Sequence, residues 1–286
     1  MSNADEDTSA SIESTMIGPL YARAKFSQLY PNLLQDNQAI DLMKRVRRLH
    51  PNSKDDFTIL EEFIDELLGL SFVIRARTFD DTIRRFIEKR PNATIANLGC
   101  GLDTTFSRVD NGTLLWCNLD LPDAIEYRLQ LIPETERSRC IPKSIFDFSW
   151  MDDIRYKPDD GLLMFAGGLF AYFTEEEVSS LFKSMAQTFP CGEIIFDSSS
   201  GRGNWFINRR FKKFGITGIN HKFEAKSKEQ IEGWSDRIRV IDWFPFFSRV
   251  EKNPKWNRGT RMIMALNSRF SLAKFIHLRF QDAHTD

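Results

Sequence analysis

The spacing of apolar residues changes once along this chain. From Thr15 to Arg90, apolar residues recur every three to four positions, which indicates amphipathic helices. Pro91 and Asn92 end this part. Beyond it, short apolar runs predict strands at 94–99, 114–120, 139–145, 161–168, 192–199, 237–244 and 274–280, and helices are predicted at 104–109, 122–130, 174–188 and 256–267. Alternating strands and helices predict an α/β protein with a doubly wound, parallel sheet.

No linker rich in proline, glycine or serine divides the chain. Residues 1–14 are polar and acidic and are expected to form a flexible tail, and 15–286 are expected to form one domain. Within it we distinguish four parts: helices at 15–90, a strand–helix core at 91–200, an aromatic and basic insertion with helical pieces at 201–235, and strands with a helix at 236–286. Thr174 and Glu177 form a capping-box pattern at the start of one helix.

Composition excludes several classes of partner. The 39 Lys and Arg nearly balance the 40 Asp and Glu, so the net charge of −1 gives no electrostatic reason to expect nucleic acid or an anionic membrane. The N-terminal residues show no apolar leader pattern, and the cytoplasm is the expected location. The four cysteines form no C-x-x-C pair, so reduced thiols are expected and a metal site is not.

A glycine turn follows the first predicted strand. Gly99 and Gly101 let the backbone approach a ligand closely, although a tight strand–helix connection explains the same pattern. Thr104 stands where a dinucleotide fingerprint has its third glycine, and Asp103 places a carboxylate at the helix start, where it would repel a pyrophosphate. Both features disfavour NAD and FAD and favour a ligand that is cationic here, such as S-adenosylmethionine.

Asp120 ends the second predicted strand, 19 residues after Gly101. A carboxylate in this position accepts hydrogen bonds from both hydroxyls of a ribose. It is also well placed to cap the helix that begins at Pro122, and the two roles are compatible.

Several motifs together resemble one family. The segments NLGCGLDTTFSR, WCNLDLPDAIEYR, PETERSRCIPKSIFDFSW and AGGLFAYFTEEEV, with LYARA near the start and FIHLRF near the end, are similar to those of the leucine carboxyl methyltransferase superfamily, in the branch of the tetracenomycin-type polyketide O-methyltransferases. The resemblance runs from about Thr15 to Phe280. It implies a seven-stranded, Rossmann-like class I methyltransferase fold, with S-adenosylmethionine as methyl donor and S-adenosylhomocysteine as product.

The resemblance also implies roles for individual residues. Those expected to bind the donor are Gly99 and Gly101 at its methionine part, Asp120 and the adjacent Leu121 at the ribose, Ser144 and Ile145 at the adenine, and Arg75 and Arg23 at the carboxylate. A guanidinium fork matches a carboxylate, although each arginine is equally compatible with a solvated helix face. At two positions the chain departs from its relatives: Gly167 replaces a glutamate, and Asn118 replaces an acidic residue.

The implied reaction moves a methyl group to a hydroxyl or carboxyl oxygen of a small molecule, such as a polyketide-like secondary metabolite. No base is evident, and His221 and Tyr172 are weak candidates. An exposed loop histidine is the favoured interpretation of His221, and Tyr172 is equally compatible with a core tyrosine. The 201–235 insertion is expected on the acceptor side, and its aromatic residues form either an apolar roof or ordinary helix cores. Two other functions stay open, a methyltransferase acting on a protein C-terminus and a donor-binding protein without catalysis. The oligomeric state is not indicated.

Overall fold

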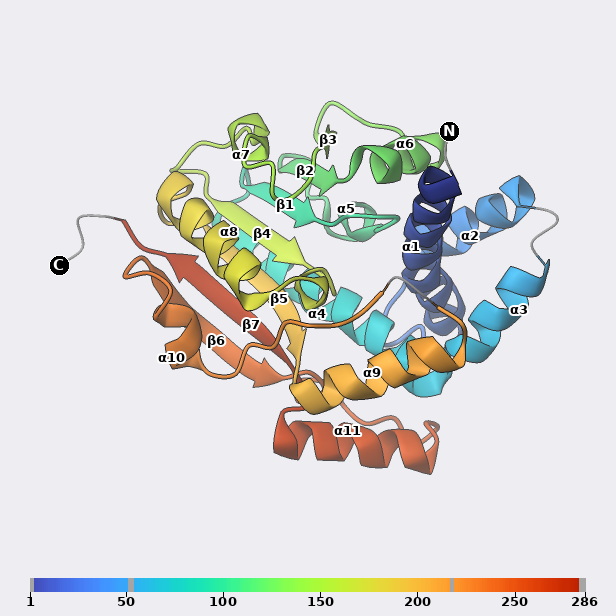
Figure 1. Cartoon of the computed structure of the whole chain (residues 1–286). Helices are drawn as coiled ribbons and strands as arrows, with labels where there is room; N and C mark the ends of the chain where they lie inside the picture. The colour runs from blue at the N-terminus through green and yellow to red at the C-terminus, as the bar shows by residue number, and fades with distance from the viewer. Residues whose placement is uncertain (1–2, 51–53, 217–218, 283–286) are drawn as a thin grey trace.

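A seven-stranded sheet forms the centre of the computed structural model, which describes residues 3–50, 54–216 and 219–282 (Figure 1). The strand order is β3-β2-β1-β4-β5-β7-β6. The strands are β1 Thr94–Leu98, β2 Leu115–Asp120, β3 Ser138–Pro142, β4 Leu162–Ala166, β5 Glu193–Ser199, β6 Ile238–Pro245 and β7 Ala273–Phe280. The first five are parallel, whereas β7 runs antiparallel to both β5 and β6, so the expected seven-stranded, mostly parallel sheet is confirmed.

The central strands are buried on both faces, which explains their continuous apolar sequences. Along β4, Leu163 and Phe165 belong to one hydrophobic core, while Met164 and the other alternate residues belong to a second core on the opposite face. Side chains of a strand point to alternate faces, so each strand contributes to both cores.

Helices cover both faces of the sheet, as a doubly wound fold requires. One core packs against α4 Glu66–Lys89, α5 Thr105–Val109 and α6 Pro122–Leu131. The other packs against α7 Trp150–Asp153, α8 Glu175–Thr188 and α10 Lys228–Glu232. Figure 1 shows α8 in front of β4 and β5. The expected capping box of α8 is confirmed, since the Thr174 side chain accepts from the backbone of Glu177 and the Glu177 side chain accepts from that of Thr174.

The N-terminal part forms four helices, namely α1 Asn3–Leu29, α2 Asn37–Leu49, α3 Lys54–Phe63 and α4. The helices expected before Pro91 are divided at Asp65, whose side chain caps α4 by accepting from the backbone N–H of Leu68 at 2.9 Å. The backbone of α1 is helical from Asn3, within the expected tail. Side chains up to Thr15 lie outside the described part, so a flexible tail stays a prediction.

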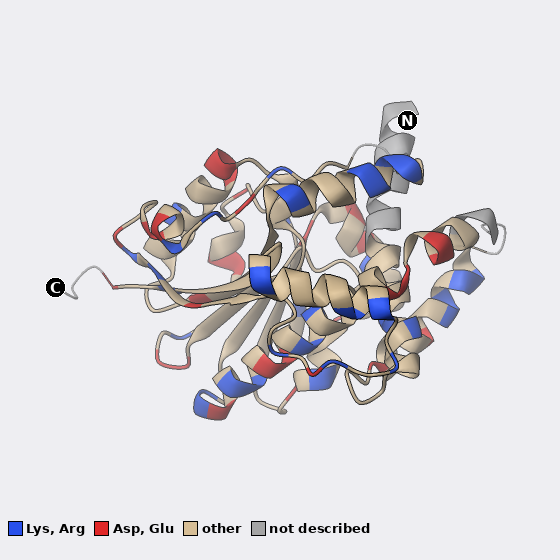
Figure 2. Cartoon of the chain, turned by 90° about the horizontal axis from the view of Figure 1, so that it is seen from below, with Lys and Arg blue, Asp and Glu red and all other residues tan. Residues whose placement is uncertain are grey.

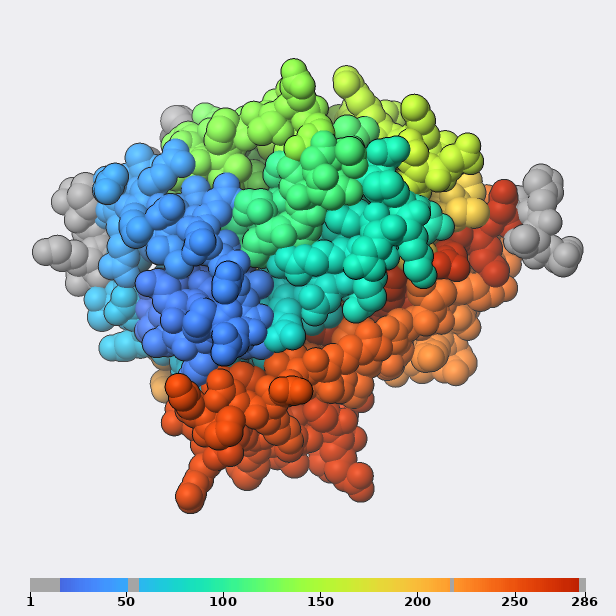
Figure 3. Space-filling view, turned by 180° about the vertical axis from the view of Figure 1, so that it is seen from behind, coloured from blue at the N-terminus to red at the C-terminus, as the bar shows by residue number. Residues whose placement is uncertain are grey.

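The C-terminal half departs from the simple alternation. A short 3-10 helix, η1 Phe170–Tyr172, follows β4, where the sequence indicates only a buried apolar run. In the 201–235 insertion, α9 Gly201–Lys213 leaves the end of β5. In the C-terminal part, α11 Arg258–Phe270 connects β6 to β7. From behind, the segment around α11 meets the N-terminal helices (Figure 3), where the Asn257 N–H donates to Glu66 Oε2 at 2.9 Å. None of the described helices is both long and apolar enough to cross a bilayer.

Candidate active site

A large cavity opens at the carboxyl ends of the parallel strands. Its volume is about 1730 Å³, and its lining includes the ends of β1, β2, β4 and β5 together with residues of α1, α3, α4, α9 and α11. Ligands in open α/β sheets bind at this edge. A site for one small molecule measures roughly 300–1,000 Å³, so this cavity has room for a donor and an acceptor together.

The glycine turn lies at one end of the cavity. Gly99 and Gly101 both have left-handed backbone conformations, with φ of 68° and 42°. A Cβ at position 99 would lie 2.8 Å from Leu169 Cδ1, and one at position 101 would lie 3.3 Å from Met16 Cγ. The positive φ therefore favours glycine at both positions, and the short distance to Leu169 also disfavours a side chain at position 99.

Two arginines donate hydrogen bonds to the backbone carbonyl groups of the turn. Arg128 donates from Nη1 to the oxygens of Gly101 at 2.7 Å and Asp103 at 2.9 Å. Arg23 donates from Nη2 to the oxygen of Leu102 at 2.8 Å and from Nε to Asp36 at 3.2 Å. The Arg23 side chain, although it lines the cavity, is thus bound to the protein itself, and its pairing with a donor carboxylate stays a prediction.

Asp120 lines the cavity next to the glycine turn and is hydrogen-bonded to it. Its Oδ2 accepts from the backbone N–H of Gly101 at 2.7 Å and its Oδ1 accepts from that of Leu121 at 2.8 Å. The residue directly before α6 is Leu121, and Asp120 contacts only that N–H at the helix start. Each carboxylate oxygen retains a further lone pair for a ligand hydroxyl. Burial raises the pKa of Asp120, against the lowering effect of both hydrogen bonds.

We expect Asp120→Ala to weaken S-adenosylhomocysteine binding by about 1–3 kcal/mol, because two ribose hydroxyls would lose their acceptor in a desolvated site. Loss of the Gly101 hydrogen bond will lower stability as well, so affinity is to be measured by calorimetry at a temperature where the variant is folded. Asp123→Ala, an exposed carboxylate in the first turn of α6, is the matched control. Equal affinity of the wild type and Asp120→Ala would leave Asp120 with a structural role only.

Residues predicted at the adenine line the cavity beyond Asp120. Ser144 and Ile145 are both in its wall, as is the half-exposed Leu121. The Ile145 carbonyl is fixed by the Trp150 indole N–H at 2.9 Å. Beside them, Phe146 and Phe173 meet edge to face with ring centroids 4.7 Å apart, and both line the cavity. This aromatic pair could not be predicted from the sequence, because its members come from separate loops.

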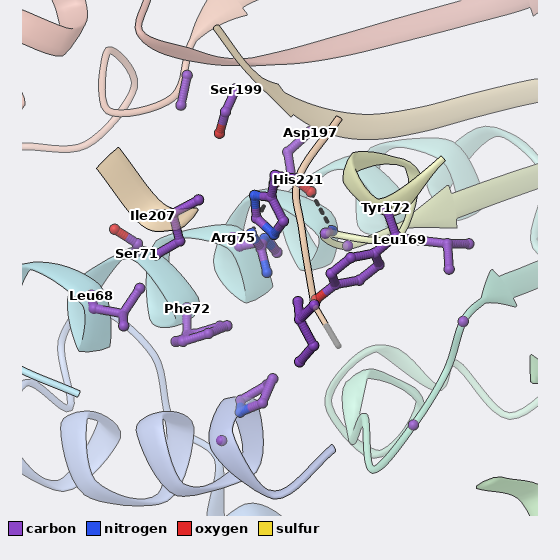
Figure 4. Close-up of a pocket in the computed structure, with 18 of the residues that line it drawn as sticks. Leu68, Ser71, Phe72, Arg75, Leu169, Tyr172, Asp197, Ser199, Ile207 and His221 are labelled. Atoms are coloured by element: carbon purple, nitrogen blue, oxygen red, sulfur yellow. Dashed lines mark hydrogen bonds and ion pairs between the residues drawn. The ribbon is translucent and has the colours of Figure 1, made fainter. Parts of the chain in front are cut away.

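Arg75 and Asp197 form an ion pair at the middle of the cavity (Figure 4). Arg75 Nη2 donates to Asp197 Oδ2 at 2.8 Å, and Asp197 Oδ1 accepts from the N–H of Gly168 at 2.7 Å. The buried Nε of Arg75 has no hydrogen-bond partner among the described residues. The sequence analysis did not identify Asp197 as a site residue, because in the sequence it is only a polar residue near the end of a strand.

Asp197 places a carboxylate near Gly167, the position at which the resemblance implies a glutamate. A Cβ at position 167 would lie 3.0 Å from Phe79 Cε2 and 3.1 Å from Arg75 Cδ, so the site has little space for a side chain there. The carboxylate of Asp197 reaches the same turn from β5. The other departure, Asn118, is buried in the sheet, where its Oδ1 accepts from the Trp116 indole N–H at 2.9 Å and its Nδ2 donates to Ser138 Oγ at 3.2 Å.

His221 and Tyr172 lie together beside this ion pair (Figure 4). Their rings meet edge to face at 5.2 Å, and Phe211 contacts His221 from α9 at 5.5 Å. Asn208 fixes the backbone of His221 through two hydrogen bonds, of 2.8 and 3.0 Å. His221 is thus part of the cavity wall rather than an exposed loop residue. Its Nδ1 is buried without a partner in the described part of the chain.

Burial sets the protonation states of this pair. Burial and the nearby charge of Arg75 lower the pKa of His221 to about 4, so its ring is neutral at pH 7. Burial raises the pKa of Tyr172, so its hydroxyl stays protonated. At neutral pH, Tyr172 therefore cannot act as a base, and His221 offers one nitrogen as an acceptor.

The far end of the cavity is apolar and aromatic. Its wall includes Phe63, Phe72, Trp205, Phe206, Phe211 and Phe246. Of the insertion aromatics expected as a roof, Trp205, Phe206 and Phe211 line the cavity, Phe214 packs against Phe63, and Phe223 is buried in a core. Some of these aromatics thus line the cavity and others form cores, and a role of the first group as the roof over an acceptor stays a prediction.

Comparison with known proteins defines first the class and then the family. Similar solved structures include a proposed methyltransferase from Thermobifida fusca (TM-score 0.59, 13% identity, 80% of this chain and 89% of that one) and a DUF574 family protein from Streptomyces avermitilis (TM-score 0.54, 10% identity, 92% and 97%). At such identities the likeness concerns the fold alone. The fold is that of the class I methyltransferases.

Sequence similarity is more specific. Residues 16–186 match the leucine carboxyl methyltransferase family. The chain is 30% identical over 276 residues to the tetracenomycin polyketide synthesis O-methyltransferase TcmP of Streptomyces glaucescens, covering 92% of this chain and 96% of that protein. It is also 30% identical over 212 residues to the S-adenosyl-L-methionine-dependent methyltransferase dpfgK of Gibberella zeae, covering 70% of each. The chain belongs to the leucine carboxyl methyltransferase family, and it is an S-adenosylmethionine-dependent methyltransferase.

Proposed function

We propose that this enzyme transfers a methyl group to an oxygen atom of an apolar small molecule. The observation that carries the proposal is one continuous cavity, with the glycine turn and Asp120 at one end and an aromatic wall at the other. TcmP and dpfgK, whose names describe an O-methyltransferase and an S-adenosyl-L-methionine-dependent methyltransferase, support it as relatives.

The residues present fit the donor that we propose. The glycine turn leaves backbone space for the methionine part, Asp120 has free lone pairs for the ribose, and Ser144 and Ile145 lie beyond it for the adenine. The unpartnered Nε of Arg75 is a donor for the carboxylate, and the nearby Asp197 carboxylate is an acceptor for the ammonium group. When bound, the donor supplies an electrophilic methyl group on a sulfonium. The protein has to align the acceptor oxygen and exclude water, and orientation alone supplies roughly 7–11 kcal/mol in favourable cases.

The state of His221 favours a carboxylate over a hydroxyl as acceptor. A phenol has a pKa of about 10 and this histidine a pKa of about 4, so moving a proton from the phenol to the histidine is unfavourable by a pKa difference of about six, or ~8 kcal/mol. A carboxylate is already ionised at neutral pH and needs no base. We therefore propose an acceptor carboxylate, with neutral His221 as a hydrogen-bonding and packing residue.

We expect His221→Gln, which keeps a polar side chain, to lower kcat less than tenfold with a carboxylate acceptor, because no proton transfer is lost. A catalytic base would be worth about 10²–10⁴-fold. The pH dependence gives a second measurement. The acceptor carboxylate also becomes protonated near a pH of about 4, so kcat/KM falls there in any case, and only a part of this fall that His221→Gln removes would report a base with a pKa of about 4. A loss of 10²-fold or more in the variant, together with that change in the pH profile, would identify His221 as the base.

Product analysis tests the function itself. The protein is incubated with S-adenosylmethionine labelled in its methyl group and with two fractions of a cell extract in separate reactions, the small molecules and the proteins. We expect label in small molecules, released by mild alkali as methanol because methyl esters hydrolyse and methyl ethers do not. Label confined to added protein would support the alternative of a protein C-terminus. Tight binding of S-adenosylhomocysteine with no transfer to either fraction would support a donor-binding protein without catalysis.

We also propose that no metal ion takes part and that the enzyme acts in the cytoplasm. Among the described residues, no group of three or more His, Cys, Asp or Glu is arranged to hold a metal. All four cysteines are free thiols, which fits a reducing compartment. Activity that survives EDTA is the expected result, whereas activity lost with EDTA and restored by magnesium would contradict the metal-free mechanism.

A further inference from the structure

Helices α9 and α11 carry large apolar side chains that are exposed, and all but Met262 of the six named below also line the cavity. Figure 1 shows α11 below α9 and roughly parallel to it, and Figure 2 colours the Lys and Arg residues of the chain. The start of α9 and the end of α11 are joined where the Ser200 N–H donates to the Leu272 oxygen at 2.7 Å. Six apolar side chains on them are between 38% and 67% exposed: Trp205, Phe206, Met262, Ile263, Leu266 and Phe270. A cluster of this kind is unusual on a soluble protein and marks an interaction surface.

The same helices are strongly basic. Their exposed charged residues are Arg202, Arg209, Lys212, Lys213, Arg258 and Arg269. Neither helix contains an Asp or a Glu. Because the whole chain has a net charge of −1, this positive charge is local rather than general. We refer to the six apolar and six basic residues together as the α9–α11 face.

The arrangement along each helix is that of an interfacial helix. On α9, the exposed residues Arg202, Trp205, Phe206, Arg209 and Lys213 recur every three to four positions and so share one side. Such helices lie in the plane of a lipid surface, with aromatic and aliphatic side chains entering the boundary of the acyl chains and Lys and Arg at the headgroups.

We propose that the α9–α11 face binds an anionic lipid surface. Exposed aromatic side chains supply the apolar contact, and the six basic residues supply attraction to anionic headgroups. The expectation of no membrane partner depended on the net charge of the chain, which averages away this local concentration. The proposal concerns adsorption to a surface and requires no helix to cross it.

Charge disfavours a second copy of the chain as the occupant. A two-fold contact would place this face against itself, with basic residues near basic residues and no acidic residue in either helix to pair with them. An anionic surface complements the same residues.

The cavity and the α9–α11 face share residues, which suggests a function for lipid binding. Trp205, Phe206, Ile263, Leu266 and Phe270 also line the cavity, so its apolar end opens within the α9–α11 face. If the proposed methyl transfer to an apolar acceptor is correct, the acceptor enters from the lipid phase without crossing water. Lipid binding itself is measured without donor or acceptor, so it fails or succeeds independently of that function.

Vesicle sedimentation tests the proposal with the full chain. The probes are vesicles of phosphatidylcholine alone and vesicles of phosphatidylcholine and phosphatidylglycerol in equal parts. We expect binding to the anionic vesicles that weakens with added salt. The variant Arg209→Glu/Lys212→Glu/Lys213→Glu should bind at least tenfold more weakly, because each basic residue near such a surface contributes about fivefold. None of the three lines the cavity, so S-adenosylhomocysteine affinity should be unchanged and reports folding.

The matched control is Arg48→Glu/Lys89→Glu/Lys183→Glu, which reverses three exposed charges on other helices. We expect it to bind as the wild type does. A second variant, Met262→Ser/Phe270→Ser, should weaken binding even at low salt. No preference for anionic vesicles, or an equal loss in the control, would overturn the proposal. So would a dimer that Arg209→Glu/Lys212→Glu/Lys213→Glu dissociates, or binding to polyglutamate but not to vesicles, which would indicate an acidic protein.

Discussion

Asp36→Ala is expected to destabilise the protein by about 3–5 kcal/mol, because it leaves buried Arg23 without its counter-charge and leaves Arg108 with Asp80 alone, at 2.8 Å. The Asp36 side chain is fully buried, and its Oδ2 accepts from Arg23, Thr104 and Arg108 at 3.2, 2.7 and 2.7 Å. Its Oδ1 caps α2 through the N–H of Ala39 at 2.9 Å. Burial alone would raise the pKa of Asp36, but Arg108, Arg23 and these hydrogen bonds lower it below its ordinary value. The carboxylate is therefore ionised at neutral pH.

Urea unfolding measures the effect, with Asp41→Ala on the same helix as the control. Asp41 pairs with Lys44 at 2.8 Å, but both side chains are largely exposed, so its removal should change stability by no more than about 1 kcal/mol. If Asp36→Ala does not fold, Asp36→Asn, which retains acceptor and donor atoms, should fold with reduced stability. Similar unfolding free energies for Asp36→Ala and Asp41→Ala would show that the network contributes little.

Arg75→Ala is expected to weaken S-adenosylhomocysteine binding by about 2–5 kcal/mol, the usual loss when one partner of a buried charge pair is truncated. The variant removes the proposed partner of the donor carboxylate and leaves Asp197 without its ion pair. Calorimetry at a temperature where the variant is folded gives the affinity.

A second ligand separates direct pairing from a structural role. 5′-Methylthioadenosine has the adenosine and sulfur of the product but no carboxylate. Arg75→Ala should bind it almost as the wild type does, while losing affinity for S-adenosylhomocysteine. Arg77→Ala, on the same helix but half-exposed and 3.6 Å from Asp81, should bind both ligands normally. An equal loss for both ligands in Arg75→Ala would mean that Arg75 acts by organising the turn at Gly168.

Local patterns in the sequence predicted most of the elements. The strands at β1, β2, β4 and β5 are apolar because both of their faces are buried, and the α8 cap depends on residues three apart. The glycine turn was predictable for the same reason, since Gly99, Gly101 and Asp120 are close along the chain and their spacing reflects one strand–helix–strand unit.

Contacts between distant residues were not predictable from such patterns. Asp197 pairs with Arg75, 122 positions earlier, and in the sequence it is only a polar residue near a strand end. Arg23 was predicted as a donor-binding residue, but its bond to the Leu102 oxygen, 79 positions away, is visible only in three dimensions. His221 was similarly ambiguous, because its burial depends on Tyr172 and Phe211 from other elements.

The place of β7 has a consequence for the order of folding. β7 lies between β5 and β6 in the sheet, although it follows both in the chain. While the polypeptide is being synthesised, β1 to β5 can assemble as a parallel sheet, but β5 keeps an open edge until residues 273–280 have emerged. An unpaired strand edge is a site of aggregation. The wall of the cavity formed by α9 and α11 can therefore close only after residues 273–280 have emerged, when the glycine turn is already in place.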